Sequence, residues 1–256
     1  DKVFIHSKTG TIRDDNDRSV AAGSGTPDRL REICELSLKN LGIDYLDAMC
    51  QSRVDPTIPI EESVGAVARL VEEGKVRFIG LSEAAPDTVR RASKTHPIVS
   101  LQFEYSLWTR DVEDGHRDAC DDLGMALMAY APLGYGFLTG VVDQAGSQSE
   151  DDIRGKFPRF FEENFDANRE RVKQLEAFAA DKDATAAQIS LAWLLTQNDN
   201  VFPIPGCKSR KHLDENLGAV DIDLTPDDLA RLEEIFPRGV AAGTRYPPGG
   251  MQRVNL

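Results

Sequence analysis

This sequence of 256 residues lacks several common signatures, and each absence excludes a class of protein. No apolar run approaches the ~18 residues that a membrane-spanning helix needs, so we expect no membrane partner. The four cysteines include no CxxC pair and are too few for a disulfide scaffold in a chain of this size, which predicts reduced thiols and a cytoplasmic location. The four histidines show no HExxH or comparable spacing, so we predict no metal site.

Positive charge is also scarce. The 30 lysines and arginines are outnumbered by 43 aspartates and glutamates, which gives a formal net charge of −13. Non-specific binding of nucleic acid needs clustered Lys and Arg, so we expect no nucleic-acid partner. A local basic pocket for one phosphorylated cofactor is compatible with this balance. No GxGxxG follows a predicted strand, which disfavours a dinucleotide-binding Rossmann sheet.

The stretch 44–82 is typical of one strand–helix–strand unit. Predicted strands over 44–51 and 76–82 flank a predicted helix over 60–75. One face of this helix carries apolar residues spaced three and four apart: Ile60, Val64, Val67, Leu70 and Val71. Gly74 suits the helix end, where a residue that tolerates positive φ is favoured. Strands joined in this way should lie parallel, and chemistry should gather where they end, at 51–53 and 81–83.

The rest of the chain continues this alternation. We predict six strands, over 2–8, 44–51, 76–82, 97–103, 125–134 and 201–205. Each is followed by at least one helix, which favours a parallel α/β fold. Six strands are two fewer than a TIM barrel has, so counting alone leaves a partial barrel and an open sheet as alternatives. We expect a loop over 10–25, a helix capped by Thr26, a long functional or mobile loop over 135–165, and a loop-like tail over 239–256.

The stretch YLDAMCQSRVDPTIPIEESVGAVARLVEEGKVRFIGLSEA closely resembles the aldo-keto reductases, in particular a branch that usually carries QHRVDP. HSKTG, LQFEYSLW, YAPLGYGFLTG and IPIPGCKSRKHLDENLGA extend the resemblance in order over nearly the whole chain. The resemblance implies a single aldo-keto-reductase-like domain over 1–256 with a TIM-barrel-type α/β fold. We expect the barrel to be incomplete: it would lack the first two β/α units and have about six parallel strands, with a long loop before the penultimate helices.

The resemblance implies catalytic roles for Lys8 and Ser52 and a substrate contact at Trp108. In the family, the lysine at the position of Lys8 lowers the pKa of a proton-donating tyrosine. That tyrosine and its partner aspartate belong to a preceding segment that we expect this chain to lack. Ser52 stands where the family's catalytic histidine would be. A serine hydroxyl can donate a hydrogen bond to a carbonyl oxygen but does not titrate near pH 7, as imidazole does.

The segment 203–216 predicts a nucleotide site. Gly206 follows a strand, and three cations follow at a helix start: Lys208, Arg210 and Lys211. Helix N-termini bind anions, although the residues alone are more typical of a solvated helix end. The resemblance implies that this segment binds the adenosine 2′-phosphate, which favours NADPH over NADH. The other cofactor contacts that it implies are Ser82 and Gln102 for the nicotinamide carboxamide, Tyr130 for its ring, Leu133, Gly136 and Leu138 for the pyrophosphate, and Glu215 and Asn216 for the adenine.

Three functions follow as hypotheses. The first is an NADPH-binding oxidoreductase that acts on a small carbonyl compound, with atypical or weak reduction. The second is a family member without redox activity that catalyses an isomerisation or a dehydration, or that binds a ligand. The third is a structural or regulatory subunit. Because an incomplete barrel would expose strand edges and apolar interior, we also expect a homodimer that covers the open side.

Overall fold

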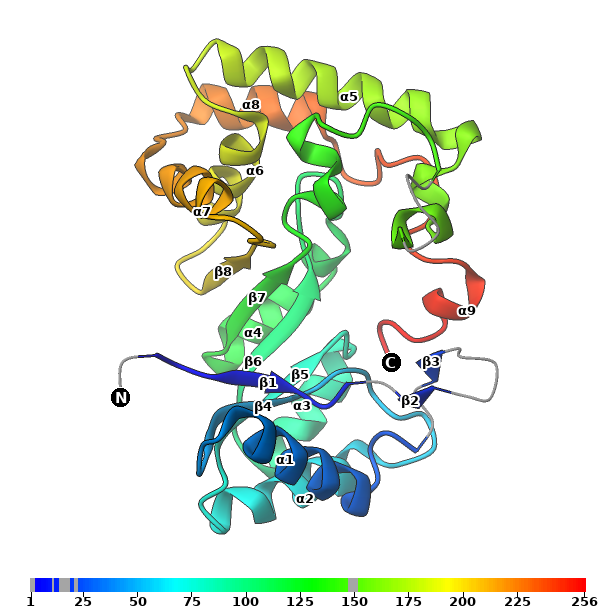
Figure 1. Cartoon of the computed structure of the whole chain (residues 1–256), viewed down its shortest axis with the longest axis vertical. Helices are drawn as coiled ribbons and strands as arrows, with labels where there is room; N and C mark the ends of the chain where they lie inside the picture. The colour runs from blue at the N-terminus through cyan, green and yellow to red at the C-terminus, as the bar shows by residue number, and fades with distance from the viewer. Residues whose placement is uncertain (1–2, 11, 14–18, 21–22, 147–151) are drawn as a thin grey trace. The chain divides into compact units, whose positions relative to one another are not determined.

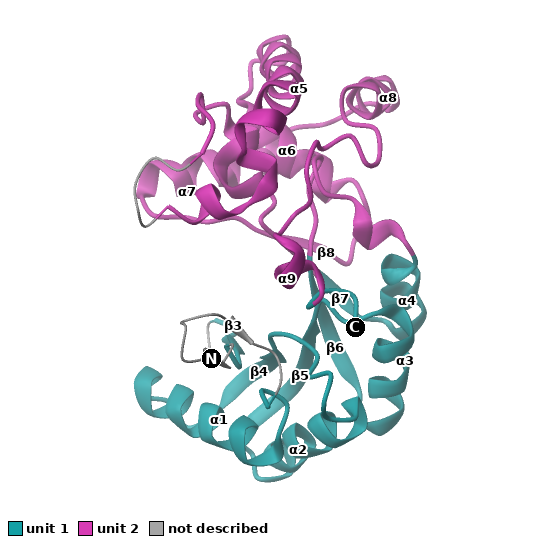
Figure 2. Cartoon of the chain, turned by 90° about the vertical axis from the view of Figure 1, so that its right-hand side faces the viewer, with its two compact units in different colours: residues 1–103, 115–127, 253–256 teal, residues 104–114, 128–252 magenta. Residues whose placement is uncertain are grey.

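The computed structural model describes residues 3–10, 12–13, 19–20, 23–146 and 152–256 (Figure 1). The chain divides into two compact units (Figure 2). Unit 1 comprises residues 1–103, 115–127 and 253–256, and unit 2 comprises residues 104–114 and 128–252. The single domain over 1–256 that the sequence predicted stays a prediction.

The strands are β1 (His6–Lys8), β2 (Ile12–Arg13), β3 (Ser19–Val20), β4 (Leu46–Gln51), β5 (Val76–Ser82), β6 (Ile98–Glu104), β7 (Ala126–Tyr130) and β8 (Val201–Ile204). The α-helices are α1 (Pro27–Leu41), α2 (Ile60–Glu72), α3 (Pro86–Thr95), α4 (His116–Leu123), α5 (Glu162–Ala180), α6 (Ala186–Leu195), α7 (Arg210–Leu217), α8 (Pro226–Ile235) and α9 (Pro248–Met251). Short 3-10 helices are η1 (Asp111–Glu113), η2 (Gly134–Thr139), η3 (Ile153–Lys156), η4 (Pro158–Phe160) and η5 (Gly218–Asp221).

Six strands form one sheet in the order β1-β4-β5-β6-β7-β8, while β2 and β3 pair separately. The pairs β1–β4, β4–β5 and β5–β6 are parallel. The strands of the sheet therefore follow one another in chain order, with helices between them, as they do in a parallel β/α barrel. The predicted α/β, TIM-barrel-type fold with six parallel strands is confirmed.

Unit 1 is built from the strand–helix–strand repeat that the sequence predicted. All six residues of β4 are buried, and β5 spans Val76–Ser82 as expected. Helix α2 buries Ile60, Val64, Val67 and Leu70 in the hydrophobic core, which fixes the face it turns to the strands. Helices α1 to α4 lie around the outside of β4, β5 and β6 (Figure 2).

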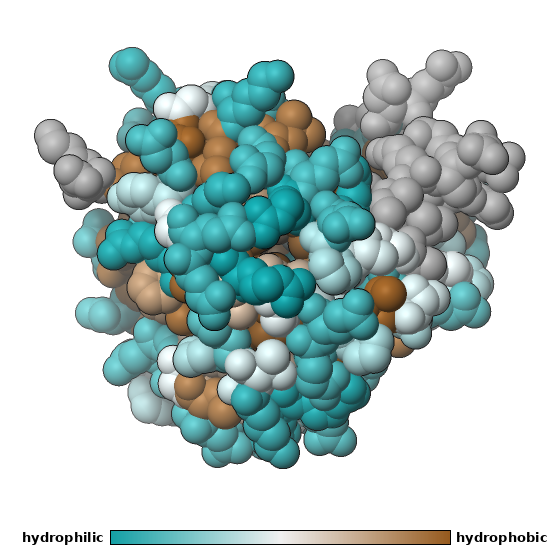
Figure 3. Space-filling model, turned by 90° about the horizontal axis from the view of Figure 1, so that it is seen from below, coloured by the Kyte–Doolittle hydropathy of each residue, from teal (hydrophilic) through white to brown (hydrophobic). Residues whose placement is uncertain are grey.

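The surface of unit 1 over α1 and α2 is charged. Arg31 of α1 pairs with Glu73, which follows α2, and Lys75 pairs with Glu35 of α1. Figure 3 shows this face mainly hydrophilic, with separate apolar areas between the charged side chains. Exposed pairs of this kind contribute about 0–1 kcal/mol each, so burial of apolar side chains rather than surface charge holds these helices in place.

Local predictions differ from the structure in three places. Thr26 precedes α1, but its hydroxyl donates to the carbonyl of Gly23 and makes no capping bond to the helix. The predicted loop over 10–25 includes the two-residue strands β2 and β3, and positions 11, 14–18 and 21–22 lie outside the described residues. The predicted loop-like tail contains the short helix α9. The Thr26 bond and the β2–β3 pairing join residues close in sequence, so these misses come from backbone geometry that residue type alone does not encode.

Unit 2 holds the segment that was predicted as a long loop over 135–165. The described part of it forms three 3-10 helices, and α5 already begins at Glu162. Aromatic rings hold it: Trp108 stacks on Phe137 with ring centroids 4.5 Å apart, and Phe160 packs edge-on against both. These rings are buried, so the aromatic residues attach the segment to the body of unit 2.

Gly134, which begins η2, fits this packing because it has no side chain. Its φ is +56°, and a Cβ there would lie 2.7 Å from Cε3 of Trp108. The backbone therefore approaches the indole ring more closely than any other residue type allows.

Candidate functional site

The predicted site residues fall into two groups, one in each unit. In unit 1 they gather where parallel strands end, because Lys8 pairs in register with Cys50 of β4, and Ser82 of β5 with Gln102 of β6. The Nζ of Lys8 donates to Oε1 of Gln102 at 2.6 Å and to Oγ of Ser82 at 3.3 Å. The structure thus brings together one predicted catalytic residue and both predicted carboxamide contacts.

Ser52 lies at the same end of the unit 1 strands and is buried. Its backbone N–H donates to Oγ1 of Thr9 at 3.1 Å, and its carbonyl accepts from the guanidinium of Arg53 at 2.6 Å. The same Arg53 nitrogen lies 3.4 Å from Oγ of Ser82. Arg53 is therefore a cation of this cluster; the sequence placed it in the stretch 51–53 at the strand end but gave it no role of its own.

Burial lowers the pKa of the Lys8 ammonium, and the nearby charge of Arg53 lowers it further, while Cys50 and Glu83 act in the opposite direction. Burial raises the pKa of the Cys50 thiol to about 11, against the effect of Lys8 and Arg53. At neutral pH the thiol is protonated and is a poor nucleophile. Lys8 is the group in this cluster whose proton has become easier to remove.

His6 is a second residue that sequence reasoning missed. It lies two positions before Lys8 on β1, so both side chains share one face of the strand. Its Nε2 is 3.2 Å from Oγ of Ser100 on β6. Burial lowers the pKa of His6, and the positive charge of Lys8 adds to that effect. Gly80 leaves room for this pair, because a Cβ there would meet Oγ of Ser100 at 2.6 Å.

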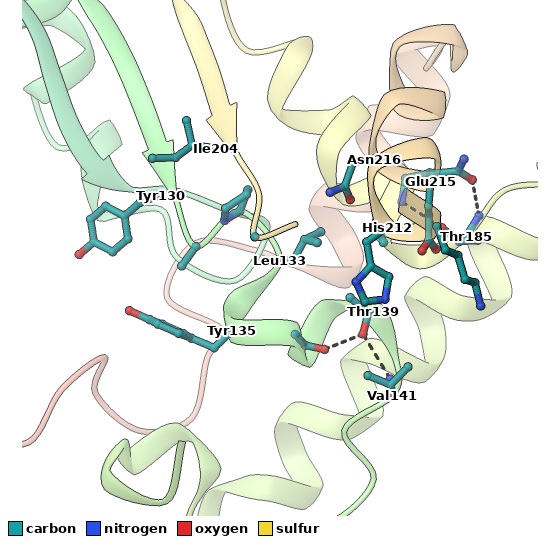
Figure 4. A pocket seen from close by; sticks show the side chains of 17 residues that line it. Tyr130, Leu133, Tyr135, Thr139, Val141, Thr185, Ile204, His212, Glu215 and Asn216 are labelled. Carbon is teal, nitrogen blue, oxygen red and sulfur yellow. Dashed lines mark hydrogen bonds between the residues drawn. The ribbon is translucent and has the colours of Figure 1, made fainter. Parts of the chain in front are cut away.

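In unit 2, a cavity of about 870 Å³ is formed by β7, η2, α6 and α7 with their adjoining loops (Figure 4). This volume lies within the ~300–1,000 Å³ typical of ligand pockets. Seven of the predicted cofactor residues line it: Tyr130, Leu133, Gly136, Gly206, Lys211, Glu215 and Asn216. Residues that line it and were missed include Tyr135, Thr139, Thr185, Gln188 and His212.

The other predicted residues of unit 2 lie elsewhere. Lys208 and Arg210 are exposed and are not among the residues that line the cavity. Leu138 is completely buried, and Trp108 is buried within the aromatic cluster of η2 and η4. Their roles stay predictions, and of the three cations only Lys211 is placed at the cavity.

Capping interactions fix two helix starts at the cavity. Thr185 caps α6: its hydroxyl accepts from the N–H of Gln188 at 3.2 Å, and the Gln188 side chain accepts from the N–H of Thr185 at 3.0 Å. Ser209 caps α7 and accepts from the N–H of His212 at 3.2 Å. Lys211 and Glu215 are four residues apart and so share one face of α7. The arrangement sets a cation and hydrogen-bonding groups beside an aromatic wall.

Among the described residues, no group of three or more His, Cys, Asp or Glu side chains is arranged to hold a metal ion. In the same part of the chain, no helix is both long and apolar enough to cross a membrane. The two groups of residues differ in chemistry: unit 1 offers a lysine with a lowered pKa among hydrogen-bonding side chains, and unit 2 offers a binding cavity.

Comparisons with known proteins agree on one family. Residues 1–236 match the profile of the Aldo/keto reductase family. The chain is 46% identical over 227 residues to "Probable aldo-keto reductase 1" of Glycine max, which covers 88% of this chain and 65% of that protein. It is 38% identical over 256 residues to "Aldo-keto reductase yakc [NADP(+)]" of Schizosaccharomyces pombe, which covers 99% of this chain and 75% of that protein.

Solved structures give the same picture. A thermostable aldo-keto reductase crystallised with the inhibitor epalrestat matches with a TM-score of 0.66 and 31% identity, over 82% of this chain and 67% of that one. A glycerol dehydrogenase from Gluconobacter oxydans matches with a TM-score of 0.83 over 97% of this chain and 76% of that one; at 22% identity this likeness concerns the fold. The chain spans about two thirds to three quarters of the length of these relatives.

Proposed function

Because this chain belongs to the aldo/keto reductase family, we propose that it binds NADPH and catalyses an NADP-dependent redox reaction of a small carbonyl compound. The observation that carries the proposal is the unit 2 cavity. Its lining includes seven of the residues that were predicted to contact the cofactor. The printed name of the fission-yeast relative includes NADP(+), which supports the same cofactor. A cytoplasmic location is part of the proposal and is supported by four free cysteines, three of them buried.

The residues present in unit 2 fit a nicotinamide dinucleotide phosphate. Tyr130 offers an aromatic face for stacking, and Lys211 offers a cation for a phosphate group. Glu215 and Asn216 offer hydrogen-bonding groups for the base. Bound NADPH would supply a hydride, and the chain's own residues would bind and orient the reactants.

In unit 1, Lys8, Ser82 and Gln102 would supply the polar contacts of the reaction. The amide of Gln102 and the hydroxyl of Ser82 can bind a carboxamide once Lys8 releases them. Lys8 can hold or release a proton at Nζ more readily than an exposed lysine, since burial lowers its pKa. Ser52 would orient a carbonyl oxygen by donating its hydroxyl hydrogen.

We propose that reduction by this chain is slow. A serine at position 52 does not titrate near neutral pH, and general acid help is worth about 10²–10⁴-fold in rate. A non-redox reaction of the same ligands, an isomerisation or a dehydration, is the second candidate. The resemblance implies that Ser52, which is buried, stands where the family's histidine would be, and this favours the second candidate.

A fluorescence titration with NADPH beside turnover on a panel of aldehydes tests the proposal. We expect saturable NADPH binding with turnover below the ~1–10³ s⁻¹ of common enzymes. Absence of NADPH binding contradicts the cofactor assignment, and turnover within the common range contradicts slow reduction. The homodimer also stays a prediction: light scattering after size-exclusion chromatography tests it, and a stable monomer at micromolar concentration contradicts it.

A further inference from the structure

Three tyrosine hydroxyls meet at one end of the unit 2 cavity. Tyr130, at the end of β7, and Tyr135, in η2, both line the cavity. Figure 4 shows their rings at the same end of it, with both hydroxyl ends turned away from α7. The hydroxyl of Tyr246 lies 2.8 Å from that of Tyr130 and 3.2 Å from that of Tyr135. Tyr246 comes from the tail that the sequence left without a role.

The number of hydrogens on the hydroxyl groups determines which group donates each hydrogen bond in this cluster. The Tyr246 hydroxyl has one hydrogen and donates it to Oε2 of Glu104 at 3.3 Å, because an ionised carboxylate can only accept. Its oxygen must then accept from both Tyr130 and Tyr135, which uses its two lone pairs. Both rings that line the cavity are thus held by their hydroxyl ends.

Glu104 is a firm anchor for this arrangement. It is 2% exposed, and its Oε1 accepts from the hydroxyl of Thr109 at 2.8 Å. The guanidinium groups of Arg159 and Arg245, themselves buried, lie 3.7 and 3.8 Å from its carboxylate oxygens. A buried carboxylate that faces two cations and accepts a hydroxyl hydrogen bond keeps its position.

The tail that carries Tyr246 is docked at several points. The side chain of Asn168 on α5 donates to the carbonyl of Ala242 at 3.0 Å and accepts from its N–H at 2.8 Å. Gly250 packs against Tyr246 so closely that a Cβ would lie 2.6 Å from the Tyr246 Cβ. Phe157 packs edge-on to the Tyr246 ring with centroids 5.5 Å apart. The phenol is therefore held from both ends.

The chemistry of Tyr135 agrees with this arrangement. Burial raises the pKa of its phenol, and the negative charge of Glu104 and the contact with Tyr246 raise it further. Tyr135 therefore keeps its hydrogen and remains a donor to Tyr246.

We propose that Tyr246 is a positioning residue that fixes the rings of Tyr130 and Tyr135 as the aromatic wall of the cavity and thereby sets its affinity for the nicotinamide cofactor. The inference rests on the proposed function for the identity of the ligand. It adds a tail residue that makes no contact with the ligand itself and acts through the two tyrosines that line the cavity.

Tyr246→Phe tests the proposal, because it removes the hydroxyl and keeps the ring. We expect the dissociation constants of NADPH and NADH to rise equally, by roughly three- to tenfold, the effect of about one hydrogen bond. Tyr105→Phe is the matched control. Tyr105 is also buried in unit 2, and its hydroxyl contacts Glu113 at 2.8 Å and Gln197 at 3.0 Å, but it is not among the residues that line the cavity. The control should lower thermal stability without changing cofactor affinity.

A double-mutant cycle separates positioning from a general loss of structure. In a Tyr130→Phe background, Tyr246→Phe should have a clearly smaller effect on NADPH affinity than in the wild type, because one of the two bonds between Tyr246 and the cavity wall has already gone. Equal effects in both backgrounds, or an unchanged affinity for Tyr246→Phe in the wild type, overturn the proposal.

A readout without cofactor keeps this inference apart from the proposed function. The chain has five tyrosines, so the protein labelled with 3-fluorotyrosine gives five fluorine resonances. Tyr246→Phe should shift those of Tyr130 and Tyr135 and leave that of Tyr105 in place. If the wild type binds neither cofactor, the proposed function fails, while these shifts still support the positioning role. Unmoved Tyr130 and Tyr135 resonances overturn that role whatever the cofactor result.

Discussion

The polar cluster of unit 1 and the cavity of unit 2 hold predicted site residues in opposite ways. In unit 1 the side chains bond to one another, as Lys8 does to Gln102 and Ser82, on strands whose register is regular. In unit 2 the cavity side chains come from a strand end, 3-10 turns and helix starts. Tyr246, which does not line the cavity, bonds to the hydroxyl of Tyr130, which does. Unit 1 thus holds a cluster of polar side chains bonded to one another, and unit 2 holds a cavity large enough for a ligand.

The largest effect that we expect concerns the unit 2 wall. Gly134→Ala should destabilise unit 2 by about 2–5 kcal/mol, from about 1–2 kcal/mol of left-handed backbone strain and about 1–3 kcal/mol of overpacking against Trp108. Gly136→Ala is the matched control, because Gly136 also has positive φ but a Cβ there would lie 3.9 Å from its nearest neighbour, Nη1 of Arg154. It should show the strain alone, about 1–2 kcal/mol.

Hydrogen exchange followed by peptide mass spectrometry resolves the two units in this test. Amides of η2 should exchange faster in Gly134→Ala, while those of β4 and β5 stay protected. Equal losses of amide protection in both units would contradict the contrast between the unit 2 wall, which depends on close packing, and the unit 1 cluster, which does not.

A smaller effect separates the three cations of the predicted phosphate grip. Lys211 lines the cavity, whereas Lys208 and Arg210 do not. Lys211→Ala should therefore weaken NADPH binding several-fold, as expected for loss of one charge-assisted hydrogen bond, and leave NADH binding almost unchanged. Lys208→Ala serves as the control and should have less effect. An equal loss for both cofactors would mean that Lys211 does not contact a 2′-phosphate.

The smallest effect concerns pH and unit 1. Burial and the charge of Lys8 depress the folded-state pKa of His6, so the unfolded chain binds the proton more readily. The contribution of His6 to stability is complete above its unfolded pKa of about 6.5 and is lost as pH falls from there toward the lower folded pKa. The free energy of unfolding should therefore fall less for His6→Gln than for the wild type between pH 7.5 and 5.

Urea unfolding at the two pH values measures this difference. His96→Gln is the control, because His96 is only partly buried and lies in the same unit. If both variants follow the wild type, His6 does not couple protonation to the folding of unit 1.

The sequence predicted the regular elements of unit 1 well because their signals are local. The spacing of Ile60, Val64 and Val67 determines the buried face of α2 within a few turns. The sequence also placed Lys8, Ser82 and Gln102 at the same end of strands in one sheet, since parallel strands end together. Thr26 shows the limit of a local rule, because its hydroxyl bonds to Gly23 in place of the helix.

The cavity wall of unit 2 could be predicted only in part. Family resemblance indicated Tyr130, but the bond from Tyr246 to Glu104 joins residues 142 positions apart, and no local pattern announces it. A charged residue at the end of the apolar strand 97–103 was the available signal for Glu104. The buried positions of Leu138 and Trp108 likewise depend on packing across the aromatic cluster, which a list of motifs does not contain.

The bond between Lys8 and Gln102 has a consequence for ligand discovery. An amide-bearing fragment that displaces Lys8 from Gln102 exchanges one hydrogen bond for another, because Oε1 of Gln102 already has a donor at 2.6 Å. Such exchanges bring little net free energy, about 0.5–1.5 kcal/mol for a typical bond. Amide fragments aimed at unit 1 should therefore bind with low affinity, and a screening campaign gains more by growing compounds from the aromatic wall of the unit 2 cavity.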